Sequence, residues 1–258
     1  MSISTNAFVP VTTTASNSLE SVAKLEQIES GEVLKGISFN AKPGTLTGIV
    51  GPSGAGKSTI SSLIPRLYDV TQGSILIDQQ DIRNYTIKSL RKLIGVVTQD
   101  SHMFHDSILN NLKYANSEAT LAEIEQACKA ARIWDFIQTL PSGLETIVGE
   151  RGHRLSGGER QRLAIARLLL KKPRIVILDE ATAHLDSENE ALVQAALKEA
   201  LIGRTSVVIA HRLSTIINAD QILVIDKGLI VESGTHEQLV QRKGLYFDLY
   251  ERQNLQEN

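Results

Sequence analysis

The sequence predicts an α/β fold with a mainly parallel sheet, an antiparallel β part and a helical subdomain. From Val33 onward, short β-branched runs alternate with helical stretches, as a parallel sheet with crossover helices requires. Between about residues 86 and 155 the strand series is interrupted by a mostly helical pattern, which we assign to the subdomain. The chain has 258 residues, enough for one such domain with a subdomain.

The first 30 residues differ in composition from the rest of the chain. They are rich in Ser and Thr, and residues 1–19 carry no charged side chain. We expect residues 1–30 to be a flexible leader, within which Ser18–Glu29 could form a short helix. The compact domain is expected over residues 31–258.

The expected strands are short apolar runs bounded by turn residues. The clearest ones are Leu46–Val50, Ile94–Thr98, Ile175–Leu178, Ser206–Ala210 and Ile222–Ile225. The run Ile75–Ile77 is assigned to the antiparallel part, and the run from Asp226 to Gly228 is assigned to a hairpin turn. Helices are expected to begin at Gly56, near Thr120, at Ser156, near Ser187 and near Thr235.

Composition excludes several classes of protein. The net charge of −2 gives no reason to expect a nucleic-acid partner. No apolar run approaches the ~18 residues needed to span a bilayer, and no secretory signal is present, so membrane association would come through another chain. The single cysteine, Cys128, cannot form an intrachain disulfide, which fits a reducing compartment. We expect it to be a buried, inert thiol.

A glycine-rich loop with a Lys-Ser pair follows the first expected strand. Gly51, Gly54 and Gly56 let the backbone curl around an anion, with N–H groups pointing inward at the start of a helix. Lys57 can reach the β- and γ-phosphates, and the Ser58 hydroxyl can ligate Mg²⁺. This is a P-loop, so the fold is expected to contain a P-loop NTPase core that binds ATP with Mg²⁺. The predicted nucleotide-binding residues are Gly51, Pro52, Ser53, Gly54, Ala55, Gly56, Lys57, Ser58 and Thr59.

A second buried strand, starting after Arg174, ends in two acidic residues. Asp179 can hold Mg²⁺ through water, and Glu180 can polarise the water that attacks the γ-phosphate. Alone, such a run is more often a strand that reaches its surface turn. In a chain that also has a P-loop, we favour the functional interpretation.

Together with the stretch Leu155–Glu159, these motifs resemble the nucleotide-binding domain of an ABC transporter over roughly residues 33–250. The resemblance implies that Ser156, Gly157 and Gly158 form a second phosphate clamp at a helix N-terminus. It also implies that this clamp engages ATP held by the opposite subunit of a head-to-tail dimer. Standing alone, the motif would indicate only a Gly-Gly turn before an amphipathic helix.

Further positions follow the family in the expected order. Gln99 resembles the Q-loop glutamine, which senses Mg²⁺ as a metal ligand and also senses the membrane subunit. His211 resembles the switch histidine that contacts the γ-phosphate. Asp186 matches the D-loop aspartate, which acts across the dimer. Ala183 and His184 replace the commoner Ser-Ala pair of that loop.

One departure concerns adenine. Family members usually have a stacking aromatic residue near their first strand, but the stretch before Glu32 has no Tyr, Phe or Trp nearer than Phe8. Base stacking of this kind is worth roughly 1–3 kcal/mol. The phosphate contacts should still support binding.

Three stretches resemble exporters within the family. Thr146–Gly152 resembles the X-loop, which contacts coupling helices of the membrane domain, and both Arg66–Asp69 and Gly244–Tyr246 look exporter-like. The resemblance implies two partners, a second ABC ATP-binding domain (identical or different) and the transmembrane domain of a transporter. It therefore implies a peripheral place on the cytoplasmic face of a membrane. The chain could be a separate subunit or a piece of a half-transporter.

We therefore expect an ATP-hydrolysing motor domain of an exporter-type ABC transporter, with Glu180, His211 and Gln99 as catalytic residues. One alternative is a soluble ABC ATPase of chromosome maintenance, repair or translation. The lack of long heptad runs and of a second P-loop argues against it. The other is a catalytically weak nucleotide-binding regulatory module, against which Glu180 and His211 argue.

Overall fold

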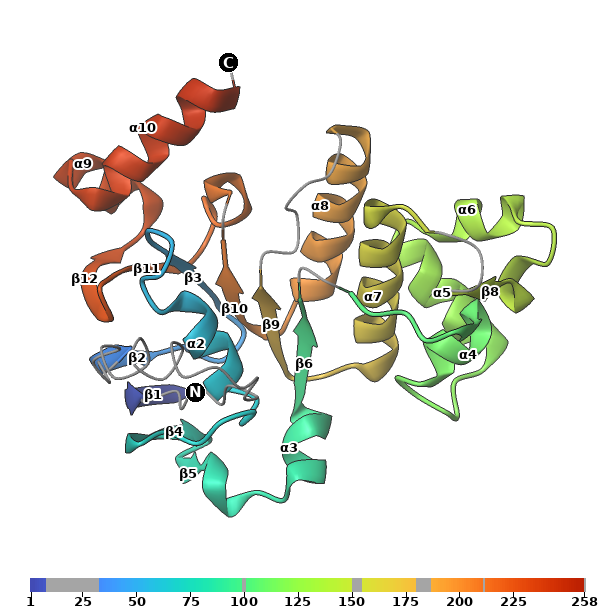
Figure 1. Ribbon diagram of the computed structural model, residues 1–258, viewed down its shortest axis with the longest axis horizontal. Coiled ribbons are helices and arrows are strands. Elements are labelled where there is room, and N and C mark those ends of the chain that lie inside the picture. The colour runs from blue at the N-terminus through green and yellow to red at the C-terminus, as the bar shows by residue number, and fades with distance from the viewer. Residues whose placement is uncertain (8–32, 99–100, 150–154, 180–186, 211, 258) are drawn as a thin grey trace, which may run out of the picture.

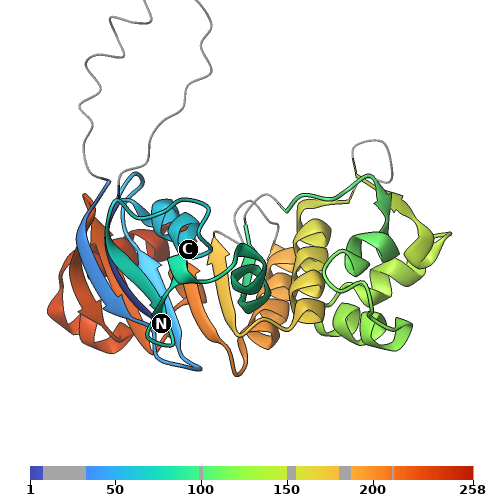
Figure 2. The ribbon, with the colours of Figure 1, turned by 90° about the horizontal axis from the view of Figure 1, so that it is seen from below.

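The computed structural model describes residues 1–7, 33–98, 101–149, 155–179, 187–210 and 212–257 (Figure 1). The strands and the C-terminal helices lie at one end of the molecule, and a group of helices lies at the other (Figure 2). No helix among the described residues is long and apolar enough to cross a bilayer.

The larger sheet has six strands in the order β12-β11-β3-β10-β9-β6. All neighbouring pairs are parallel except the edge pair of β11 and β12, so the mainly parallel sheet predicted from the sequence is confirmed. The five predicted strands are all in this sheet. Its strands are β3 (Leu46–Val50), β6 (Ile94–Val97), β9 (Ile175–Asp179), β10 (Thr205–Ile209), β11 (Gln221–Asp226) and β12 (Leu229–Gly234).

The smaller sheet is antiparallel and has the order β2-β1-β4-β5. It contains the predicted antiparallel run Ile75–Ile77. Its strands are β1 (Ser2–Ala7), β2 (Leu34–Asn40), β4 (Gln72–Ile77) and β5 (Gln80–Asp81).

The expectation of a flexible leader is wrong for Ser2–Ala7, which form the strand β1 between β2 and β4. The ammonium group of Met1 also donates a hydrogen bond to the Ala41 carbonyl over 2.8 Å. Strand pairing satisfies backbone N–H and C=O groups, so a stretch without charged side chains, in which Ile3 is the one large apolar residue, can still form a central strand. Residues 8–30 lie outside the described residues, so the leader and its short helix remain predictions there.

Some helices pack beside the larger sheet, and others form a separate group at the opposite end of the molecule from the C-terminal helices. α4, α5 and α6 lie at the far end from β12 and contact the sheet side through α7 (Figure 1). The predicted range of the helical subdomain, about 86–155, also contains β6, which belongs to the larger sheet. The helices are α2 (Lys57–Leu63), α3 (Ile87–Leu93), α4 (Ile108–Lys113), α5 (Leu121–Ala130), α6 (Trp134–Thr139), α7 (Gly157–Lys171), α8 (Ser187–Leu201), α9 (His236–Arg242) and α10 (Leu245–Glu257). Three short 3-10 turns (Ile82–Asn84, Gly143–Glu145 and Leu213–Thr215) and a small strand pair, β7 (Asp106–Ser107) with β8 (Ile147–Val148), complete the described elements.

Three helices begin where the sequence places capping residues. Thr120, Ser156 and Thr235 each cap a helix in a reciprocal capping box with the residue three positions later. Each box satisfies two backbone N–H groups that would otherwise lack partners. The expected starts of α5, α7 and α9 are therefore confirmed.

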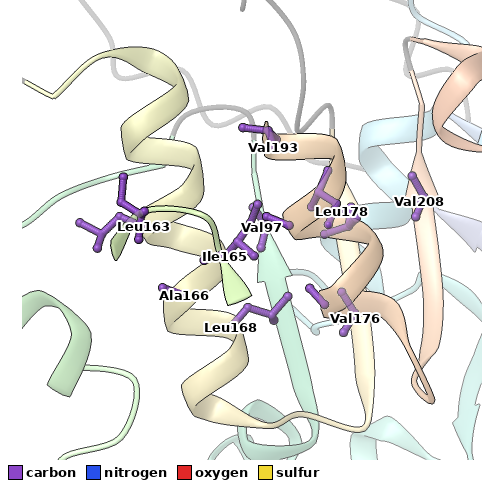
Figure 3. Packing of buried hydrophobic residues seen from close by; sticks show 14 of the residues in the cluster. Val97, Leu163, Ile165, Ala166, Leu168, Val176, Leu178, Val193 and Val208 are labelled. Atoms are coloured by element: carbon purple, nitrogen blue, oxygen red, sulfur yellow. The ribbon is translucent and has the colours of Figure 1, made fainter. Parts of the chain in front are cut away.

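Two hydrophobic cores cover the two faces of the larger sheet. Val176 and Leu178 of β9 belong to one core, whereas Ile175 and Ile177 belong to the other. Figure 3 shows the first core, where α7 and α8 pack onto the strands. Because both faces are covered, the strands read as continuous apolar runs rather than alternating ones.

Candidate nucleotide-binding site

The loop between β3 and α2 can be built only with glycine at its start. Gly51 has φ +152°, and a Cβ atom added there would lie 1.9 Å from the Ile225 carbonyl oxygen. Gly56 has φ +103°, and its added Cβ would lie 2.7 Å from Leu34 Cδ2. Close approach of other segments therefore requires glycine at Gly51 and Gly56, whereas an added Cβ at Gly54 would meet no such neighbour among the described residues.

The start of α2 has no side-chain cap. Gly56 is the N-cap residue in a left-handed conformation, without a capping hydrogen bond and without an acidic residue in the first turn. The backbone N–H groups of a first helical turn need partners from outside the helix. Together with the positive end of the helix dipole, they are suited to bind phosphate oxygens.

Lys57 is the first residue of α2, and its side chain folds back onto the loop. Its ammonium group donates to the carbonyl oxygens of Gly51 and Pro52, each over 2.8 Å, and the residue is buried. Ser53, Gly54 and Ser58 are exposed at the rim of the same loop. The loop thus holds a cation against its own carbonyls, where an incoming phosphate would meet it.

Asp179 ends β9 beside this loop. Its Oδ2 accepts a hydrogen bond of 2.6 Å from the Ser61 hydroxyl, whereas its Oδ1 is buried and has no hydrogen-bond partner among the described residues. A buried carboxylate oxygen without a partner is unfavourable unless a ligand supplies one. Carboxylate oxygens and hydroxyls are ligands that Mg²⁺ prefers, so Asp179 and Ser58 fit a magnesium ion that accompanies ATP.

Four predicted site residues, Gln99, Glu180, Asp186 and His211, lie outside the described residues, so their roles remain predictions. Three of them directly follow Thr98, Asp179 and Ala210. These come at the carboxyl ends of β6, β9 and β10, on the sheet edge where β3 enters the P-loop. In open sheets of this kind, ligands bind outside the carboxyl ends of the strands.

The predicted signature residues begin α7. The Ser156 hydroxyl oxygen accepts from the Glu159 N–H over 3.2 Å, and the Ser156 N–H donates to Glu159 Oε2 over 2.7 Å. Gly158 lies against α8, since an added Cβ would be 2.6 Å from Asn189 Oδ1. The start of α7 lies on the other side of β9 from α2 (Figures 1 and 2). The structure therefore does not bring the signature residues onto the P-loop of the same chain.

A groove of about 360 Å³ lies between β6 and α7. Phe104 and Tyr114 line it and are 39% and 74% exposed. Arg167 in its wall donates to the carbonyls of Asn111 and His102 over 2.9 and 2.7 Å. Burial lowers the pKa of both Arg167 and Lys171, and the nearby Arg91 lowers that of Lys171 further. The sequence did not reveal this groove, because it depends on which aromatic side chains stay exposed.

The exporter-like stretches are only partly described. Ile147 and Val148 of the predicted X-loop form β8, which pairs with β7. Leu67 and Tyr68 are exposed, whereas Tyr246 is buried with its hydroxyl 2.8 Å from His236 Nδ1. Phe8, the nearest upstream aromatic residue, lies outside the described residues.

Comparisons with known proteins identify the family of the chain. The family described as "ABC transporter" matches residues 34–183. The heavy metal tolerance protein of Schizosaccharomyces pombe is 57% identical over 212 residues, which is 82% of this chain and 26% of that protein. The ATP-dependent lipid A-core flippase of Methylobacillus flagellatus is 52% identical over 218 residues, which is 84% of this chain and 37% of that protein.

A solved structure of a bacterial Atm1-family ABC exporter with ATP bound superposes with a TM-score of 0.81 at 49% identity. The match covers 88% of this chain and 40% of that one. The fold is thus the P-loop NTPase fold of ABC proteins, a class whose domains bind ATP and are ATPases. The chain belongs to the ABC transporter family.

Proposed function

We propose that this chain hydrolyses ATP as the motor domain of an exporter-type ABC transporter. The observation that carries the proposal is the buried Asp179 Oδ1 at the end of β9 beside the P-loop, which has no hydrogen-bond partner among the described residues. Binding of Mg-ATP requires a loop that holds the phosphates and, beside it, an oxygen ligand for magnesium.

Within one chain, the residues bind and orient the nucleotide. The uncapped N–H groups of α2 and the Lys57 ammonium hold the β- and γ-phosphates, while Ser58 and Asp179 hold the metal ion. Bound Mg²⁺ supplies charge neutralisation on the phosphate oxygens. Glu180 accepts a proton from the attacking water, and Gln99 and His211 contact the metal and the γ-phosphate.

The second half of the site comes from a partner. Because the Ser156 oxygen accepts the Glu159 N–H, its own hydroxyl proton stays available to donate to a phosphate oxygen. Ser156, Gly157, Gly158 and Asp186 would act on ATP held by the other domain. If both domains are identical, the interface is isologous and ATP closes two equivalent sites.

The groove between β6 and α7 is the contact surface we assign to the transmembrane domain. Its exposed aromatic side chains and the half-buried cationic side chains of Arg167 and Lys171 suit an amphipathic helical segment with an acidic residue. Docking there places the chain on the cytoplasmic face of a membrane as a peripheral domain. The two relatives differ in what their names say, so the cargo is not assigned.

The test is the rate of Mg-ATP turnover by the purified chain. Glu180→Gln should lower the rate by about 10²- to 10⁴-fold, the usual contribution of a general base. Glu118→Gln, an exposed residue of the helical part, is the matched control and should leave the rate unchanged. Equal rates in Glu180→Gln and the unaltered chain would instead favour the regulatory module.

A further inference from the structure

A residue outside the P-loop motif contacts the metal-binding carboxylate. Ser61 lies one turn beyond Ser58 in α2 and exposes only 5% of its surface. Its hydroxyl oxygen is 2.6 Å from Asp179 Oδ2, although the two residues are 118 positions apart in the sequence. The contact exists because α2 packs against β9.

The Ser61 hydroxyl has one proton and two possible acceptors. The Ser58 carbonyl oxygen lies at 2.9 Å, and the carboxylate oxygen lies at 2.6 Å. An ionised carboxylate is the stronger acceptor, and 2.6 Å is within the range of charge-assisted O–H···O⁻ hydrogen bonds. We therefore infer that the Ser61 hydroxyl donates its hydrogen bond to Asp179 Oδ2, which stays ionised.

This hydrogen bond distinguishes the two oxygens of Asp179. Oδ2 is occupied by the protein, whereas Oδ1 is buried without a partner among the described residues. A carboxylate without such a hydrogen bond rotates about its side-chain torsions. It loses conformational entropy when it binds a ligand. Fixing one oxygen in advance leaves the other in a defined position for the metal.

We propose that Ser61 is a positioning residue, which holds the Asp179 carboxylate so that Oδ1 serves magnesium. The inference rests on the proposed function, because the metal accompanies ATP. It goes beyond the motif, since Ser61 lies outside the predicted nucleotide-binding residues 51–59. The neighbouring Ser62 donates to the same Ser58 carbonyl over 2.9 Å, so it reproduces the local helix contact without the carboxylate.

The experiment measures metal affinity rather than turnover. The dissociation constant of Mn²⁺, used as a paramagnetic substitute for Mg²⁺, is determined by electron paramagnetic resonance with a non-hydrolysable ATP analogue. Affinity for the same analogue is measured separately in EDTA. The variants are Ser61→Ala, Ser61→Thr to restore the hydroxyl, and Ser62→Ala as the matched control, each checked by thermal unfolding.

Ser61→Ala should raise the Mn²⁺ dissociation constant about tenfold, as expected for loss of a hydrogen bond to a charged group. Metal-free nucleotide affinity should stay within about twofold, and both Ser61→Thr and Ser62→Ala should bind Mn²⁺ like the unaltered chain. If Ser61→Ala does not fold, Ser61→Cys replaces it, because a thiol is a weak donor.

Unchanged or tighter Mn²⁺ binding in the hydroxyl-free variant would overturn the inference while leaving the proposed function intact. An equal loss of metal-free nucleotide affinity would also overturn it, because the defect would then be in the P-loop. Failure of the unaltered chain to bind Mn²⁺ with the analogue would overturn the inference and the proposed function together.

Discussion

The two glycine-rich helix starts, those of α2 and α7, use glycine for different purposes. At α2, Gly51 and Gly56 have positive φ, and the N-cap offers no side chain to the first-turn N–H groups. At α7, Gly157 and Gly158 are helical residues, and Ser156 caps the helix in a reciprocal box with Glu159. The first start leaves its first-turn backbone donors to a ligand, whereas at the second the capping box satisfies the N–H groups of Ser156 and Glu159 within the single chain.

The P-loop glycines at α2 thus serve the predicted nucleotide site. The glycines at the start of α7 also allow two helices to pack closely. Gly158 allows α7 to approach Asn189 of α8, and Arg162 donates to the same Asn189 side chain over 2.7 Å. Contacts within the single chain therefore fix the position of the α7 start. Substitutions at the two starts should separate these purposes.

Gly51→Ala should have the largest effect. The added methyl group would meet backbone at 1.9 Å, and no side-chain rotation can relieve that contact. We expect a loss of about 3 kcal/mol or more in the free energy of unfolding, with loss of nucleotide binding. Urea denaturation and nucleotide titration measure the two effects.

Gly54→Ala is the matched control in the same loop. Gly54 also has positive φ, +77°, but no atom of the described residues other than Gly54 and its two chain neighbours lies within 4 Å of an added Cβ. Only conformational strain of about 1 kcal/mol is expected. Similar losses in both variants would contradict a loop limited by close backbone approach at Gly51.

Gly158→Ala should destabilise the fold by about 2 kcal/mol without weakening binding of nucleotide to the P-loop. Its added Cβ meets three atoms of Asn189 at 2.6–2.7 Å, which forces the two helices apart. Combining it with Asn189→Ala removes two of those atoms, so the double variant should lose less than the sum of the single losses. Strict additivity in urea denaturation would show that the two residues do not compete for space.

Ser156→Ala removes a helix cap and should reduce the free energy of unfolding by about 1 kcal/mol. Thr120→Ala removes the equivalent capping box of α5 and should give a similar loss. Only Ser156→Ala should also weaken ATP-dependent dimerisation, measured by light scattering. Equal weakening by both variants would indicate a general loss of stability rather than a contact made by Ser156.

The smallest expected signal comes from Cys128 in α5, which packs against α7. Burial raises the pKa of this thiol to about 12, against roughly 8.5 for an exposed thiol. Its neutral form is thus favoured by folding, and that stabilisation is complete below the unfolded pKa and is lost as the pH rises through the folded one.

At about pH 8, Cys128 should therefore react with Ellman's reagent only after unfolding. Gly158→Ala should speed the reaction by loosening α7, and Gly54→Ala should not. Fast labelling of the unaltered chain would contradict the buried environment that the sequence predicted and the structure describes.

Local patterns in the sequence predicted the parallel strands, the P-loop glycines and the starts of α5, α7 and α9. Each of these depends on residues that are neighbours in the chain. The contacts between Ser61 and Asp179 and between Gly158 and Asn189 were not predicted, because they depend on how helices pack on the sheet. β1 was missed for a related reason, since its pairing uses backbone groups that composition does not reveal.

The most direct test of the central claim is the mass in solution of Glu180→Gln, with and without Mg-ATP. The substitution should block hydrolysis and leave binding intact, so closed dimers would accumulate. A monomer that becomes a dimer only with Mg-ATP is the predicted result, and it would show that the α2 start of one copy meets the α7 start of another. A monomer under both conditions would contradict the account of α7 as a phosphate clamp for a second copy.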